Sequence, residues 1–175
     1  RGPRRDGTVS GVQIETDWTA NAPIEIWRRP VGPGWSSFAV AGALLFTQEQ
    51  RGDDETVVCY NEADGDQVWV HVDKTKFHEA MGGVGPRATP TVSGEEVYAL
   101  GANGRLNCLE KATGKLVWST DMAADAGAKI PTWGFSSSPL VCGDLVVVYA
   151  GAAHAGMVAY DRRSGKTAWT CKAGT

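Results

Sequence analysis

The sequence lacks long apolar runs, paired cysteine motifs and any strong excess of charge of one sign. No apolar stretch approaches the roughly 20 residues that a membrane-spanning helix needs. The 17 basic and 20 acidic residues leave a formal charge of −3, so no nucleic acid or other polyanionic partner is indicated. The four cysteines and three histidines form no CxxC motif and no metal-ligand spacing, which argues against a zinc site.

Two residue types are abundant. Of 175 residues, 42% are apolar and 21% charged, as in an ordinary globular domain. The 22 glycines indicate many turns, and the seven tryptophans indicate a core built around large flat side chains. The chain opens on RGPRRDG, without an initiator methionine or an apolar signal segment, so we interpret it as processed or partial.

One eleven-residue pattern occurs three times. It reads CYNEADGDQVW at 59–69, CLEKATGKLVW at 108–118 and AYDRRSGKTAW at 159–169, each with a glycine in seventh place and a closing tryptophan. The tryptophans Trp69, Trp118 and Trp169 are 49 and 51 residues apart. Trp27 precedes Trp69 by 42 residues and is interpreted as the end of a further unit. Self-similarity at this period is typical of repeat architectures.

Each unit predicts four short strands. Gly42, Gly94 and Gly143 each follow a short apolar segment, and a second strand, a variable loop and a third strand come next. The predicted second strands are 43–47, 97–100 and 145–150, and the third strands are 56–60, 105–109 and 157–160. The fourth strand carries the tryptophan. Short strands separated by turn glycines leave almost no room for helix, apart from a weak helical candidate at 73–80.

The turn before each tryptophan is predicted to be a hairpin and not a cation loop. Gly65, Gly114 and Gly165 stand where a tight hairpin needs a positive φ. In the first unit Asp64 and Asp66 flank the glycine, but the second unit has threonine and lysine there. A calcium site would not survive that exchange, whereas the hairpin does.

The tryptophans are predicted to be structural. A sheet of four strands cannot bury both of its faces alone, but a radial stack of such sheets can. We therefore predict that Trp27, Trp69, Trp118 and Trp169 wedge between neighbouring sheets rather than contact a ligand.

The three motifs resemble the repeat of the PQQ-like (quinoprotein-type) β-propellers, over about residues 24–174. The resemblance implies an all-β propeller sector of four-stranded antiparallel blades, part of a ring of seven or eight. The expected boundaries are an irregular lead-in at 1–22, a leading outer strand at 23–31, and blades at about 35–72, 86–121 and 135–173. The rest of the ring, or a partner protein, is then expected to cover the open blade faces.

The resembled family implies three alternative functions. The first is a non-catalytic binding or scaffolding module without a cofactor, in the periplasm or outside a bacterial cell. The second is a sector of a pyrroloquinoline quinone (PQQ)-dependent alcohol or aldose dehydrogenase that would use PQQ and calcium. The third is a carbohydrate-associated module. No two cysteines are adjacent, and no calcium-ligand set or catalytic aspartate maps onto this chain, so we favour the first.

The ligand face is expected where the fourth strand of one blade leads to the first strand of the next. These long connections carry Trp35, His78, Arg87 and Trp133. Arg87 would bind a carboxylate or phosphate if it faces the channel; the alternative is a surface arginine paired with a carboxylate. The three histidines are expected in solvated loops. Cys59 and Cys108 are expected to be buried free thiols, too far apart for a disulfide.

Overall fold

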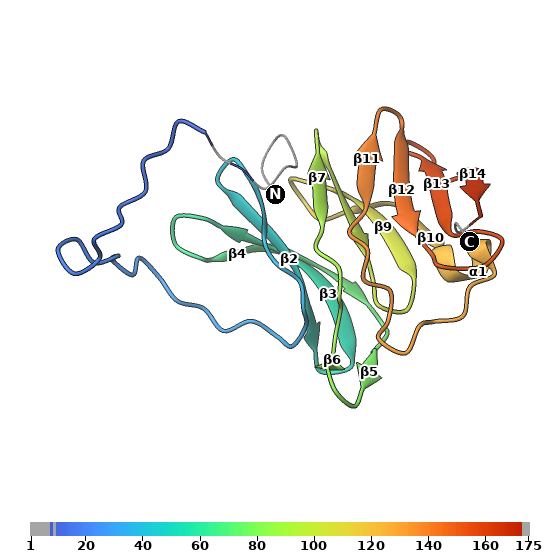
Figure 1. The fold of residues 1–175 in the computed structure, drawn as a ribbon, viewed down its shortest axis with the longest axis horizontal. Helices are drawn as coiled ribbons and strands as arrows, with labels where there is room; N and C mark the ends of the chain where they lie inside the picture. Colours follow the sequence, from blue (N-terminus) through green and yellow to red (C-terminus); the bar gives the residue numbers. More distant parts are fainter. Residues whose placement is uncertain (1–7, 9, 173–175) are drawn as a thin grey trace.

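The computed structural model describes residue 8 and residues 10–172, and it contains three four-stranded antiparallel sheets. Figure 1 shows them side by side, with the second between the other two. Blade 1 comprises β1 (Ala39–Ala41), β2 (Leu44–Arg51), β3 (Asp54–Asn61) and β4 (Gln67–Asp73). Blade 2 comprises β7 (Thr91–Ser93), β8 (Glu96–Leu100), β9 (Arg105–Glu110) and β10 (Leu116–Asp121). Blade 3 comprises β11 (Leu140–Cys142), β12 (Leu145–Tyr149), β13 (Met157–Asp161) and β14 (Thr167–Cys171). The all-β propeller sector is therefore confirmed.

The strands of each blade are joined in chain order, each antiparallel to the last. The short first strand of blade 2, β7, contacts both β1 and β11, the first strands of its neighbours, as expected of strands that line one axis. In the described part of the chain, no helix is long and apolar enough to cross a membrane.

Blade 2 is apolar on both faces because its strands alternate between two cores. On β8, Val97 and Ala99 pack with Phe46 and Trp69 of blade 1. The alternating residue, Tyr98, instead packs with Val146 and Val148 of blade 3 and is fully buried. This period of two is the burial pattern of a sheet sandwiched between two others.

Every blade has the same irregularity beside its tryptophan. The register between the third and fourth strands shifts once in each blade, between Cys59 and Tyr60 in blade 1 and at the equivalent places in the others. The shift leaves Val68, Val117 and Ala168 without a partner in the ladder, as in a β-bulge. The tryptophan follows the unpaired residue directly.

Two connections differ from expectation. Residues 73–80, the weak helical candidate, form no helix: the segment turns and enters a small hairpin of β5 (His78–Glu79) and β6 (Gly83–Val84). The one helix among the described residues is α1 (Met122–Ala126), in the next connection. Asp121 caps its first turn by accepting from the N–H of Ala124, and Gly127 ends it with φ of 60°.

Residues 23–31, expected as a leading strand, are not part of any sheet in the described structure, because no strand runs beside them to complete a ladder. Figure 1 shows the segment before β1 looping out past blade 1. It still contacts the blade: the indole N–H of Trp27 donates to the carbonyl of Glu62 over 2.7 Å.

Candidate functional site

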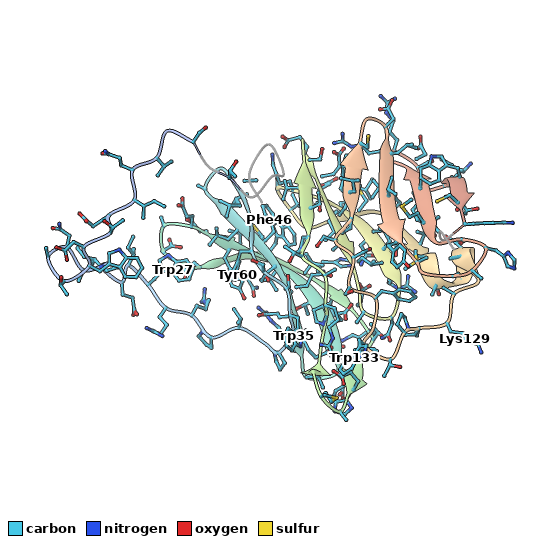
Figure 2. The ribbon with its side chains drawn as sticks, in the orientation of Figure 1. Trp27, Trp35, Phe46, Tyr60, Lys129 and Trp133 are labelled. Carbon is cyan, nitrogen blue, oxygen red and sulfur yellow. The ribbon has the colours of Figure 1, made fainter. Side chains whose placement is uncertain are left out.

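Three connections meet at one end of the blades and enclose an open cavity of about 530 Å³. Its walls include Trp35 from the segment before β1, Met81 from the β5–β6 hairpin, and Trp133 from the segment after α1. We call these three side chains the aromatic cup. Figure 2 shows Trp35 and Trp133 close together beside that hairpin. The remaining lining residues are Glu79, Gly82, Arg87 and Ser136.

The cup side chains are exposed although their backbones are held. Trp35 is 67% exposed, Met81 83% and Trp133 52%. The backbone N–H of Trp35 donates to the carbonyl of Pro86 over 2.8 Å, and its indole N–H donates to the carbonyl of Gly82 over 2.9 Å. The Trp35 ring is thereby fixed in place before any ligand arrives.

Arg87 lies beneath the cup with all of its N–H groups engaged. Its Nε donates to the carbonyl of Trp133 over 3.1 Å, and Nη1 donates to the carbonyls of Val84 and Gly85 over 3.4 and 3.0 Å. Nη2 donates to the carbonyl of Gly83 over 2.8 Å and to Oε1 of Glu79 over 3.3 Å. A guanidinium has five N–H groups, so none is left to bind a carboxylate or phosphate.

Glu79 neutralises the buried cation. Its side chain is 9% exposed and that of Arg87 is 7% exposed, and the Arg87 guanidinium lies 5.1 Å from the centre of the Phe77 ring. The second oxygen of Glu79 accepts from the N–H of Met81 over 2.7 Å, while the first also accepts from Gly82. The ion pair ties Arg87 to the hairpin, and the Nε hydrogen bond of Arg87 ties it to the Trp133 segment. Arg87 is therefore paired with a carboxylate, as one of the two alternatives expected, but its side chain is buried and not at the surface.

We expect Arg87→Ala to lower the free energy of unfolding by about 3 kcal/mol, because it leaves Glu79 charged and unpaired in a buried place. Urea denaturation monitored by circular dichroism measures this change. The control is Arg28→Ala: Arg28 pairs with Glu25 while its side chain is 82% exposed. That change is expected to stay within about 0.5 kcal/mol. Equal effects of the two substitutions would contradict the assignment.

The structure gathers three of the four sequence-predicted candidates. Trp35, Arg87 and Trp133 line one cavity, whereas His78 is exposed on β5 and does not line it. Glu79 and Met81 were not predicted to line the site. The sequence did contain one signal for Glu79, because it is an acidic residue only eight positions before Arg87 and could be its partner. His71 was expected in a solvated loop, but it lies in β4 with its side chain 15% exposed, because its strand position faces blade 2.

The indoles of the repeat stack on glycines of the following blade. A Cβ atom placed on Gly65, Gly114 or Gly165 would come within 2.6, 2.4 and 2.6 Å of the rings of Trp27, Trp69 and Trp118 respectively. Each indole N–H also donates to a carbonyl three residues before that glycine, over 2.7–2.9 Å. Trp169 is 40% exposed. We infer that Trp69 and Trp118 set how neighbouring blades pack, and that Trp27 holds its segment against blade 1.

A buried carboxyl group lies at the seam between blades 1 and 2. Glu55 on β3 is 3% exposed and accepts from the N–H of Ala102 over 3.3 Å. Burial raises its pKa from 4.5 to about 7; the negative charge of Asp73 adds to this, while the Ala102 N–H and the Arg87 cation oppose it. Gly101 leaves room for the carboxyl group, because a Cβ there would lie 2.1 Å from Glu55 Oε1.

We expect Glu55→Gln to make the fold more stable at alkaline pH. The folded chain holds this proton more tightly between pH 4.5 and about 7, so raising the pH through that window weakens the native chain. Relative to the unsubstituted chain, the variant should gain roughly 2 kcal/mol between about pH 5 and pH 8. Urea denaturation at both pH values tests this, with the exposed Glu62→Gln as control. A difference that does not change with pH would contradict it.

The two buried cysteines lie within the blades and do not line the cup. Cys59 and Cys108 are free and buried, as expected, and burial raises the pKa of each to about 11. Among the described residues, no group of three or more histidine, cysteine, aspartate or glutamate side chains could hold a metal ion.

The three four-stranded blades, with their first strands side by side, define the chain as a sector of a β-propeller. The sequence profile of the family described as outer membrane protein assembly factor BamB matches residues 7–106 and again residues 53–175. The two matches together span nearly the whole chain, and the chain belongs to this family. No curated protein is significantly similar to it in sequence.

Solved structures with this fold include enzymes and an assembly-factor homologue. A quinohemoprotein alcohol dehydrogenase from Comamonas testosteroni is 20% identical, with a TM-score of 0.58 over 81% of this chain and 21% of that one. BamB from Moraxella catarrhalis is 17% identical, with a TM-score of 0.54 over 82% and 38%. A europium-containing methanol dehydrogenase is 17% identical, with a TM-score of 0.62 over 83% and 26%. The chain spans only 21–38% of these proteins, and such identities show the fold alone.

The residues that line the cup do not fit PQQ. PQQ carries several carboxylates, which need free cationic donors, but every N–H of Arg87 at the cup is already engaged. A calcium ion needs six to eight oxygen ligands, and no acidic cluster of that kind occurs in this part of the chain.

Proposed function

We propose that the chain is a non-catalytic binding or scaffolding module that acts on a protein partner in the periplasm or outside the cell. The observation that carries this proposal is the aromatic cup, which presents Trp35, Met81 and Trp133 to solvent above a neutralised ion pair. Exposed aromatic and methionine side chains gathered in one place are typical of protein interfaces. The family description, which names an outer membrane assembly factor, supports the same class of function and location.

Site-specific photocross-linking tests the proposal. A photoreactive phenylalanine analogue placed at Ser136, in the full-length protein inside its own cells, should give a discrete protein adduct. The same analogue at Lys115, an exposed turn residue in blade 2, is the control. An adduct from position 136 that disappears with Trp133→Ala supports the proposal. The absence of any adduct specific to position 136 would contradict it.

The dehydrogenase alternative rests on the similarity of the fold to quinohemoprotein and methanol dehydrogenases. It is tested by incubating the full-length protein with PQQ and calcium, followed by dialysis. We expect no retained quinone absorbance and no dye-linked oxidation of alcohols or aldoses. Retention of one quinone per chain together with such oxidation would replace our proposal.

A further inference from the structure

We propose that the aromatic cup seats one uncharged apolar or aromatic side chain from an extended segment of the partner protein, clamped between Trp35 and Trp133. This inference rests on the proposed function and names the chemistry of the partner. A cavity of about 530 Å³ has room for one large side chain together with its flanking backbone.

The charge of the occupant is limited by the floor of the cup. Arg87 has no free N–H group, and both oxygens of Glu79 already accept hydrogen bonds. A charged side chain placed here would lose its water and find no ion-pair partner, which is costly. A neutral side chain has no such cost. The cup therefore selects against carboxylates and phosphates, and it holds no unpaired carboxylate to receive an ammonium group.

The polar groups that remain favour a peptide over a carbohydrate. The indole N–H of Trp35 is used by the carbonyl of Gly82. Among the described lining side chains, the nitrogen and oxygen atoms without a hydrogen bond in the free protein are Trp133 Nε1 and the Ser136 hydroxyl. One donor and one hydroxyl can satisfy a backbone carbonyl and N–H of an extended segment, whereas a sugar ring presents several hydroxyls that would lose water without replacement.

The walls are suited to an apolar anchor. Tryptophan is enriched among residues that carry most of the energy of protein interfaces. One hydrogen bond holds the Trp35 backbone and one holds its indole N–H, so little ordering is required when a ligand binds. Met81, at 83% exposure on the hairpin, has a flexible side chain that can close over occupants of different shape. The fixed Trp35 ring beside a flexible thioether favours a bulky side chain such as phenylalanine or leucine.

Fluorine NMR of the 5-fluorotryptophan-labelled protein tests the inference. The probes are four: blocked pentapeptides Ser-Gly-X-Gly-Ser with X as phenylalanine, glutamate or lysine, and cellopentaose. Trp35→Phe and Trp133→Phe assign the two cup resonances. The phenylalanine peptide should shift these two resonances, at a dissociation constant of about 1 mM, and leave those of Trp69 and Trp118 unchanged. The glutamate and lysine peptides should bind about tenfold more weakly or worse.

Variants sharpen the test. Trp133→Ala should weaken binding of the phenylalanine peptide about tenfold or more. Lys129→Ala, four residues earlier in the same segment and exposed, should leave affinity within about twofold. Unshifted Trp69 and Trp118 resonances show in each variant that the blades remain folded. Equal binding of the charged peptides, or a tenfold loss with Lys129→Ala, would overturn the inference in favour of charge recognition.

The remaining outcomes separate this inference from the proposed function. If no peptide shifts the cup resonances at about 10 mM while the position 136 cross-link persists, the neutral-anchor inference is wrong and the binding module stands. If cellopentaose alone shifts them, both fail, and the carbohydrate-associated alternative takes their place.

Discussion

Replacing Trp118 by alanine is expected to lower the free energy of unfolding by about 4 kcal/mol, since it leaves a cavity between blades 2 and 3. Trp118 is 8% exposed, its ring packs against Tyr98 with centroids 5.9 Å apart, and its indole N–H donates to Arg162 over 2.9 Å. The substitution removes all of these contacts at once. Urea denaturation followed by circular dichroism gives the change directly.

Trp169→Ala is the matched control. Trp169 occupies the equivalent position on β14, but it is 40% exposed. A side chain that keeps much of its contact with water forfeits less on truncation, so the expected loss is about 1 kcal/mol. Similar losses at both positions would mean that the stability does not come from the seam between blades.

The second large effect is expected from Gly114→Ala, at about 4 kcal/mol. Gly114 has φ of 70°, which costs an L-residue about 1 kcal/mol or more. Its new Cβ would also lie 2.4 Å from the Trp69 ring, which is 8% exposed and has no room to move away. Such overpacking typically adds about 1–3 kcal/mol.

Gly143→Ala separates the two causes. Gly143 has φ of 57°, but a Cβ there meets nothing within 4 Å. Only the backbone cost should remain, about 1 kcal/mol. The difference between the variants, measured under the same conditions, isolates the contact with the indole. No difference would show that backbone conformation alone explains the glycine.

The blades could be predicted from the sequence because the same local pattern of turn glycine and tryptophan occurs three times. Gly65, Gly114 and Gly165 all have positive φ, as the hairpin required, and the tryptophans follow at fixed distance on β4, β10 and β14. These features depend on neighbours in sequence or on a period of two, both of which are visible without coordinates.

The connections were harder because they follow no period. α1 has five residues, too short for a helical pattern, and its signals were the capping Asp121 and the closing Gly127. The predicted helix at 73–80 was wrong because His78 and Glu79 pair with a second strand of only two residues. Residues 23–31 have strand-like composition, but a strand also needs a partner alongside it.

The cup was also only partly predictable from the sequence. Trp35, Trp133 and Arg87 could be named as ligand-face candidates because they lie in long connections on a rigid scaffold. Their arrangement could not be predicted, because it depends on the Arg87–Glu79 ion pair and on carbonyls brought together by the β5–β6 hairpin. Counting the donors of Arg87 required the folded geometry, and that count favours the alternative in which Arg87 pairs with a carboxylate.

A double-mutant cycle between Trp69 and Gly114 tests most directly whether each indole is seated on the glycine of the next blade. In the Trp69→Ala background, Gly114→Ala should cost only about 1 kcal/mol instead of about 4, a coupling of about 3 kcal/mol. If the two losses are additive to within about 0.5 kcal/mol, the ring and the glycine do not interact, and the blades are held together by other contacts.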